Sequence, residues 1–206
     1  MVTIINYDAG NIKNVQKIFS LLGCDSNISS SSDVINNSKA LVLPGVGSFK
    51  DGMENLEKLD LIKTIRYLVL EKKIPILGIC LGMQLFSKVG FEGGKTLGLN
   101  LLEMECHPIK TNKKKYRVPH IGWNSININP SSKLLKGVHD GSDFYFVHSY
   151  AVQTENKSLI SSNVSYGSDI ISSIEFENIY ATQFHPEKSQ RYGKKVINNF
   201  IKLIEV

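Results

Sequence analysis

The chain contains 206 residues, of which 42% are hydrophobic and 21% are charged. This length and composition predict one domain, residues 1–206, with one substantial core. The 24 Lys and Arg against 19 Asp and Glu give a net charge of +5, an excess too small and too scattered to predict nucleic-acid binding. We also find no apolar run long enough to cross a bilayer and no signal-peptide pattern, so we expect a cytoplasmic protein with no membrane partner.

The three cysteines are Cys24, Cys80 and Cys106. Their odd number and wide spacing exclude a disulfide framework and a paired metal knuckle. We therefore expect no metal site. Each cysteine is either a packed core residue or a reactive thiol.

Strand and helix patterns alternate in the first part of the chain. Each predicted strand is followed by a predicted helix, in the pairs 3–6 and 12–22, 40–43 and 56–69, and 74–79 and 81–88. Consecutive βα units predict an α/β fold with a mostly parallel, doubly wound sheet flanked by helices.

After about residue 99 the pattern changes to short alternating segments separated by turn residues, which predicts strands. These strands are expected at 125–129, 144–147, 158–164, 170–176 and 179–184, before a final helix at 193–205. We therefore expect extra antiparallel strands in the C-terminal half. The serines at 29–32 are interpreted as a loop.

Cys80 lies in Gly78-Ile79-Cys80-Leu81-Gly82, between a predicted buried strand and a predicted helix. This G-x-C-x-G pattern is typical of a nucleophile elbow, in which a sharp turn exposes the nucleophile and glycines relieve the crowding around it. The following helix N-terminus would favour a thiolate. A small buried core cysteine is the alternative, and we assign that role to Cys24 and Cys106.

A thiol nucleophile needs a base and a group that orients the base. His185 is the strongest candidate, because an apolar run leads into it and Glu187 follows two residues later. His120 and His148 are weaker alternatives. The two remaining histidines, His107 and His139, are interpreted as surface residues.

With these residues assigned, the chain resembles the class I, triad-type glutamine amidotransferases, and most closely the glutaminase subunits of imidazole glycerol phosphate synthases. The resemblance extends over nearly the whole chain. Its motifs lie at 6–11, 44–49, 78–84, 119–124, 145–150 and 183–187. The family usually has an acidic residue and a glycine on either side of the first tyrosine, where this chain has Asn6 and Asp8.

The resemblance implies that Cys80 attacks the side-chain amide of glutamine, that His185 transfers protons and that Glu187 orients His185. It implies no cofactor. An oxyanion forms in both steps, and two N–H donors should face it. Leu81 would supply one donor, and Val46 or Gly47 the other.

The same resemblance implies two further sets of residues. A glutamine-binding set consists of Gln84, Glu92, Tyr145, His148, Ser149 and Tyr150. A second set, at the contact with a (β/α)8-barrel cyclase that receives ammonia in a heterodimer, consists of Asn11, Asn14, Trp123 and Lys188. For each residue, an ordinary packing or surface role is the alternative.

Other functions are alternatives to this one. A related glutaminase could supply ammonia to a cell-surface sugar amidotransferase, and a cysteine peptidase or thiol hydrolase could use the same elbow. A non-catalytic binding module would use the basic cluster of Lys110, Lys113, Lys114, Lys115 and Arg117. Residues 45–50 begin like a dinucleotide fingerprint, but Lys50 stands where a small residue is needed.

Overall fold

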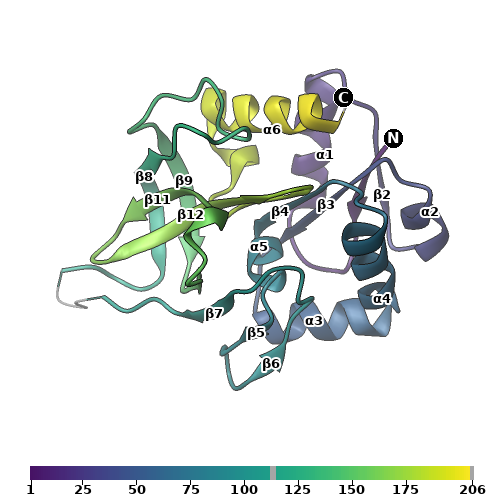
Figure 1. Cartoon of the computed structure of the whole chain (residues 1–206), viewed down its shortest axis with the longest axis horizontal. Helices are drawn as coiled ribbons and strands as arrows, with labels where there is room; N and C mark the ends of the chain where they lie inside the picture. Colours follow the sequence, from purple (N-terminus) through teal and green to yellow (C-terminus); the bar gives the residue numbers. More distant parts are fainter. Residues whose placement is uncertain (112–114, 205–206) are drawn as a thin grey trace.

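The computed structural model describes residues 1–111 and 115–204. Within them, nine strands form one sheet in the order β2-β1-β3-β4-β13-β12-β11-β8-β9 (Figure 1). The first five are paired in parallel: β1 Val2–Ile5, β2 Ser26–Ser29, β3 Ala40–Gly45, β4 Ile76–Cys80 and β13 Ile179–Thr182. The others are antiparallel: β12 Asp169–Phe176, β11 Ile160–Ser165, β8 His120–Ile128 and β9 Asp143–His148. The predicted fold class is confirmed.

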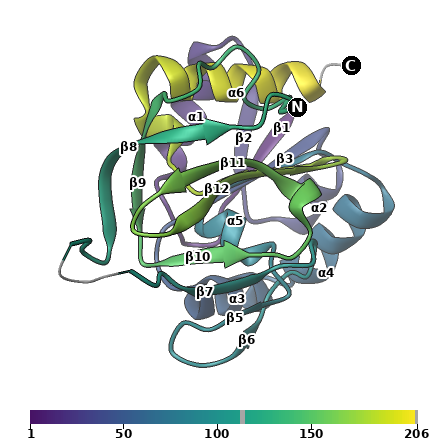
Figure 2. The same cartoon turned by 60° about the vertical axis from the view of Figure 1, so that its left-hand side comes forward.

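A smaller sheet lies beside the first, in the order β10-β7-β5-β6 (Figure 2). Its strands are β5 Val89–Gly90, β6 Thr96–Leu97, β7 Glu105–Pro108 and β10 Tyr150–Gln153. We did not predict these strands. Two of them are only two residues long, too short to show an alternating pattern.

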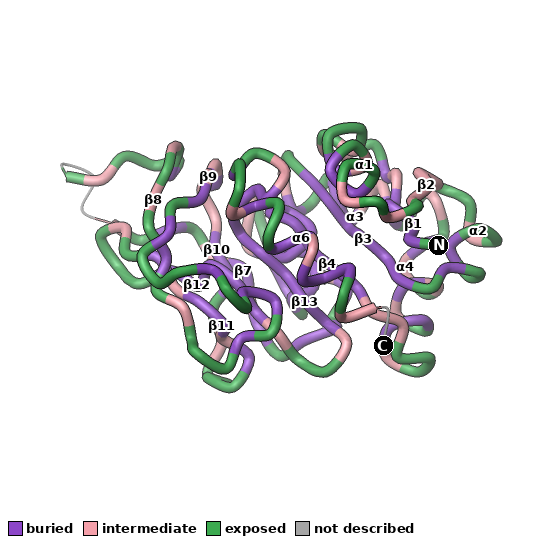
Figure 3. The backbone as a smooth tube through the Cα atoms, turned by 90° about the horizontal axis from the view of Figure 1, so that it is seen from above, coloured by how far each residue is buried: buried purple, intermediate pink, exposed green. Residues whose placement is uncertain are grey.

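The helices cover both faces of the parallel half of the sheet. They are α1 Ile12–Leu21, α2 Ser32–Asn36, α3 Phe49–Lys58, α4 Leu61–Arg66, α5 Leu81–Leu85 and α6 Gln190–Ile204, with a π-helical turn η1 Tyr67–Glu71 and short 3-10 helices η2 Lys157–Leu159 and η3 Pro186–Lys188. One core contains α1 and α6, and the other contains α2, α3, α4 and α5. Strand residues alternate between these two cores, which explains the continuous apolar runs of β3 and β4 (Figure 3).

Two predictions from the N-terminal half were wrong. The single helix expected at 56–69 is α3, α4 and η1, because Asp60 has φ +55° and interrupts the helix. The serine run is not one loop, since it contains the end of β2 and the start of α2. In the basic cluster, Lys113 and Lys114 lie outside the described residues.

The turn between β1 and α1 explains the departure from the family pattern at Asp8. Asp8 has φ +59°, a left-handed conformation in which glycine is favoured and aspartate is tolerated. The Asp8 N–H donates to Oδ1 of Asn6 at 3.3 Å. The turn therefore forms without a glycine at this position.

We expect Asp8→Gly to raise the free energy of unfolding by up to about 1 kcal/mol, because it removes left-handed strain. Asp33→Gly is the matched control. Asp33 lies in the first turn of α2, so the same change should lower stability by about 0.5 to 1 kcal/mol. Urea denaturation measures both values, and an Asp8→Gly protein as destabilised as Asp33→Gly would contradict this account.

Candidate active site

Cys80 lies at the junction of β4 and α5, in a backbone conformation that side chains rarely adopt, with φ +55° and ψ −106°. The two glycines of the elbow allow this turn. A Cβ at Gly82 would lie 1.7 Å from the carbonyl oxygen of Leu43, and one at Gly78 would lie 2.7 Å from the ring of Phe86. Helix and strand can therefore approach each other only because both positions are glycine.

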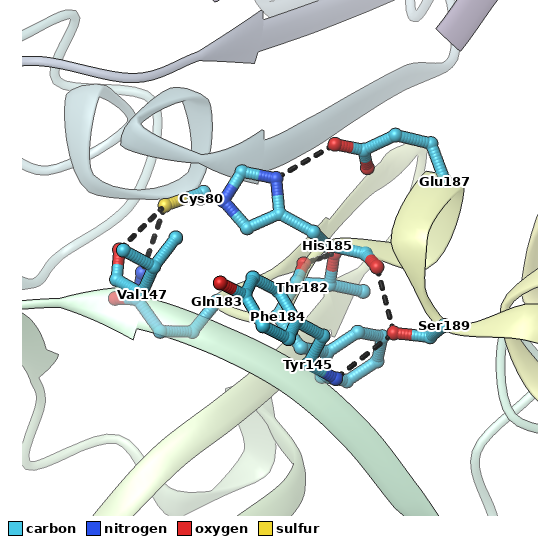
Figure 4. A network of polar contacts seen from close by, with 9 residues as sticks. All are labelled: Cys80, Tyr145, Val147, Thr182, Gln183, Phe184, His185, Glu187 and Ser189. Carbon is cyan, nitrogen blue, oxygen red and sulfur yellow. Dashed lines mark hydrogen bonds and ion pairs between the residues drawn. The ribbon is translucent and has the colours of Figure 1, made fainter. Parts of the chain in front are cut away.

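Strand β13 brings His185 and Glu187 to Cys80. It pairs with β4 in parallel, so its carboxyl end meets the elbow. His185 Nδ1 lies 2.7 Å from Oε1 of Glu187. Because a carboxylate accepts, Nδ1 carries the proton. The imidazole lies between the sulfur and the carboxylate (Figure 4).

The charges on both sides of His185 control its protonation. Burial lowers the pKa of the imidazole, but its interactions with Cys80 and Glu187 outweigh burial and raise the pKa to about 9. A protonated His185 beside the sulfur can give its proton to a leaving nitrogen. The pair is therefore arranged for acyl transfer.

The backbone of His185 is held by two neighbours. Its N–H donates to the carbonyl of Tyr145 at 2.9 Å. The Ser189 hydroxyl donates to the His185 carbonyl at 2.7 Å and accepts from the Tyr145 N–H at 3.0 Å. These bonds fix the turn after β13 against β9, and so fix the distance between imidazole and sulfur.

Gln183 also contacts the nucleophile, and we did not predict it. Its Nε2 donates to Sγ of Cys80 at 3.6 Å, while its Oε1 accepts from Nε2 of Gln84 at 3.1 Å. An amide donor stabilises negative charge on sulfur. Gln183 and His185 are two residues apart, so extended backbone would place them on one face, and this signal could have revealed Gln183.

A cavity of about 340 Å³ opens above Cys80, a size in the range of small-molecule sites. Ten of the sixteen residues predicted for the site and partner contact line it. Those that line it are Val46, Gly47, Cys80, Leu81, Gln84, Glu92, His148, Ser149, Tyr150 and Lys188. Tyr145 does not line it; its ring lies 6.4 Å from that of His185 and below Nζ of Lys188 at 5.4 Å.

Gln84 and Glu92 each make contacts that shape the cavity. Gln84 Nε2 also donates to the carbonyl of Tyr150 at 2.9 Å, which joins α5 to β10. Glu92 Oε2 accepts from the Phe49 N–H at 2.7 Å, at the start of α3. This bond uses one carboxylate oxygen, and the other can bind a cation.

His148, which lines the cavity, and His120 behind it form a buried chain of neutral imidazoles. His148 Nδ1 donates to the carbonyl of Tyr150 at 2.8 Å, so its Nε2 accepts from His120 Nδ1 at 3.0 Å. Burial lowers the pKa of His148 to about 3 and that of His120 to about 4. Neither can hold a catalytic proton near neutral pH, so neither is suited to the role of base that the sequence predicts for His185.

The predicted partner-contact residues lie on segments that contact one another, and only Lys188 of the four lines the cavity. Trp123 is 49% exposed and its ring lies 6.0 Å from that of Tyr145. Asn11 and Asn14 are exposed at the start of α1, which contacts η3. Helix η3 carries Lys188.

Two further observations concern only residues 1–111 and 115–204. No group of three or more His, Cys, Asp or Glu in this part of the chain could hold a metal ion. None of its helices is long and apolar enough to cross a membrane.

Comparison with known proteins identifies the class. Residues 3–203 match the model of the family "Glutamine amidotransferase class-I", and the chain belongs to this family. PurLQS from Thermotoga maritima has a similar fold, with a TM-score of 0.75 at 16% identity over 98% of this chain and 97% of that one.

Curated relatives extend over the full length of the chain. Those from Campylobacter jejuni and Pelagibacter ubique are 42% and 43% identical, over 98% of this chain and 100% and 99% of their own lengths. One from Archaeoglobus fulgidus is 38% identical over all of both chains. They bear the name imidazole glycerol phosphate synthase subunit HisH, numbered 1 in Campylobacter jejuni. The predicted enzyme class is confirmed.

The raised pKa of His185 predicts the pH at which activity falls on the alkaline side of the pH profile, the alkaline limb. We expect kcat/KM for glutamine to fall above about pH 9, as the imidazolium loses its proton. Glu187→Gln removes the negative charge that favours the imidazolium, so the limb should move to lower pH by about one unit. The kcat should also fall roughly 100-fold or more. A limb at the same pH in both proteins would contradict the role of Glu187.

The lowered pKa of His148 predicts a loss of stability in acid. The unfolded histidine, with a pKa of about 6.5, binds a proton that the folded one excludes until about pH 3. The contribution of neutral His148 to the free energy of unfolding is therefore fully present above pH 6.5. Below that pH the free energy of unfolding falls, with a limiting slope of about 1.4 kcal/mol per pH unit. Urea denaturation at pH 7, 6 and 5 should show this slope reduced in His148→Gln and unchanged in His139→Gln, at an exposed site.

Proposed function

We propose that residues 1–206 form a single glutaminase domain that hydrolyses glutamine through a thioester on Cys80 and passes ammonia to a (β/α)8-barrel cyclase in a heterodimer. The product of the complex would be imidazole glycerol phosphate, in histidine biosynthesis. One observation carries the chemistry: His185 lies between the sulfur of Cys80 and the carboxylate of Glu187, at a cavity the size of a small-molecule site. The names of the full-length relatives support the pathway.

The reaction begins with attack by the Cys80 sulfur on the side-chain amide carbon of glutamine. The resulting oxyanion is bound by the N–H of Leu81 and by a second N–H, from Val46 or Gly47. Protonated His185 gives its proton to the nitrogen, and ammonia leaves. His185 then takes a proton from water, which attacks the thioester and releases glutamate.

The cavity offers complementary charges for the rest of the substrate. The carboxylate oxygen of Glu92 that Phe49 does not occupy would bind the α-ammonium group. The Ser149 hydroxyl and the neighbouring main chain would bind the α-carboxylate. Tyr145, outside the cavity, would act on the substrate only through its contact with His185.

Two segments that contribute to the cavity lining, at Val46 and at 118–123, carry exposed apolar side chains, and this apolar rim supports the docking of a partner. Val46, Val118, Ile121 and Trp123 are 36 to 59% exposed, and Pro119, next to Val118, lines the cavity itself. Large apolar side chains exposed together are typical of protein interfaces. A partner seated on this rim would keep ammonia from water.

The test is glutamate release by the chain alone and with the histidine-pathway cyclase and its ligand. We expect the cyclase to increase the rate. Cys80→Ala should abolish release in both conditions, and release that persists would refute the mechanism. Release that the cyclase leaves unchanged would refute the histidine-pathway assignment and favour an acceptor such as a sugar amidotransferase.

Trp123→Ala tests the docking surface. Because exposed tryptophans at interfaces often dominate affinity, the cyclase concentration for half-maximal stimulation should rise about tenfold or more. Phe176→Ala is the matched control: Phe176 is 42% exposed at the end of β12, away from the cavity lining. Equal effects of the two substitutions would contradict docking at this rim.

A further inference from the structure

The hydroxyl of Tyr7 is an unpaired polar group in the core. Tyr7 is fully buried, and its Oη has no hydrogen-bond partner within residues 1–111 and 115–204. Phenylalanine would fill the same space without this desolvation penalty. Tyr7 Oη is one of six such unpaired atoms in the described part of the chain. Because most buried polar atoms are paired, its lack of a partner points to one in another arrangement of the neighbouring chain.

The Tyr7 hydroxyl lies against the backbone next to the nucleophile. A Cβ atom at Gly45 would lie 2.1 Å from Tyr7 Oη and 2.9 Å from Cβ of Leu81. Gly45 pairs with Cys80 across β3 and β4, and it begins the loop 45–47. The hydroxyl therefore contacts the base of the loop to which we assign the second oxyanion donor.

The loop has room to change its conformation. Gly47 has φ +120°, and a Cβ there would meet nothing within 4 Å. The Val46 side chain is 45% exposed. The loop is therefore open on its Val46 and Gly47 side, where rotation about the bonds that flank the Gly45–Val46 peptide group reverses the directions of its N–H and C=O.

The position of Tyr7 relative to the cavity indicates which orientation of the Gly45–Val46 peptide group its hydroxyl can stabilise. Val46, Gly47 and Leu81 line the cavity, and Tyr7 does not. When the Val46 N–H faces the cavity, the Gly45 carbonyl points away from the cavity lining, to which Tyr7 does not belong. Burial, with a smaller effect of Cys80, raises the pKa of Tyr7 far above its usual value, so the hydroxyl remains a donor.

We propose that Tyr7 is a positioning residue for the oxyanion hole, whose hydroxyl donates to the Gly45 carbonyl when the Val46 N–H faces the substrate. This hydrogen bond forms only when the Val46 N–H faces the substrate. It therefore stabilises that orientation of the peptide group relative to the orientation in which the Tyr7 hydroxyl is unpaired. Tyr7 acts through the loop and touches no reacting atom. The inference rests on the proposed glutaminase function.

Tyr7→Phe removes the hydroxyl and keeps the ring. In whichever state gives the wild type its highest kcat, alone or with the cyclase and its ligand, we expect kcat to fall about tenfold. The KM for glutamine should stay within about twofold, because the oxyanion is absent from bound substrate. The melting temperature should be unchanged or higher, since the variant buries no unpaired hydroxyl.

Tyr180→Phe is the matched control. Tyr180 is also buried, its ring packs 5.9 Å from that of Phe200, and it does not line the cavity. This variant should keep the wild-type kcat. The wild type must itself release glutamate in the same assay, and if it does not, the proposed function fails rather than the role of Tyr7.

Three results would overturn the proposal for Tyr7. A kcat of Tyr7→Phe equal to that of the wild type would mean that the hydroxyl stabilises neither arrangement of the loop. A kcat above that of the wild type would mean that the hydroxyl stabilises the inactive arrangement. A fall in kcat accompanied by a lower melting temperature and a raised KM would show a structural role only.

Discussion

The candidate active site depends on one backbone constraint, the strained positive-φ conformation of Cys80 between β4 and α5. It holds the nucleophile at the carboxyl edge of the parallel sheet, where α/β folds place their ligands. Parallel pairing then brings two other segments to the same edge, because Gly45 is opposite Cys80 on one side and β13 ends beside it on the other. The loop 45–47, to which we assign an oxyanion donor, and His185 therefore approach the sulfur from neighbouring strands.

The electrostatics of the site follow from this arrangement. His185 is buried between two groups that favour its protonated form, and this outweighs the effect of burial. His148, equally enclosed but bonded to a carbonyl and to His120, has its pKa lowered. Two buried histidines near one cavity thus differ in charge because their partners differ, and only His185 is suited to acid–base chemistry.

The sequence correctly predicted those strands and turns that depend on residues close together in the chain. The apolar runs of β3 and β4 and the glycines around Cys80 are local signals, and the structure has the expected strands and turn there. Strand β2 and helix α2 were missed because their polar, half-exposed residues show no apolar periodicity. The contact of Gln183 with the sulfur and the isolated Tyr7 hydroxyl were also missed, because both depend on segments distant in sequence.

The central claim is that Cys80 carries the acyl group of glutamine during turnover. The most direct measurement is intact-protein and peptide mass spectrometry after acid quenching of the enzyme with saturating glutamine. The account predicts one added glutamyl group on the peptide that contains Cys80, removed by hydroxylamine and absent from Cys80→Ser under the same treatment. Steady glutamate release with no adduct on Cys80, or an adduct on Cys24 or Cys106, would contradict it.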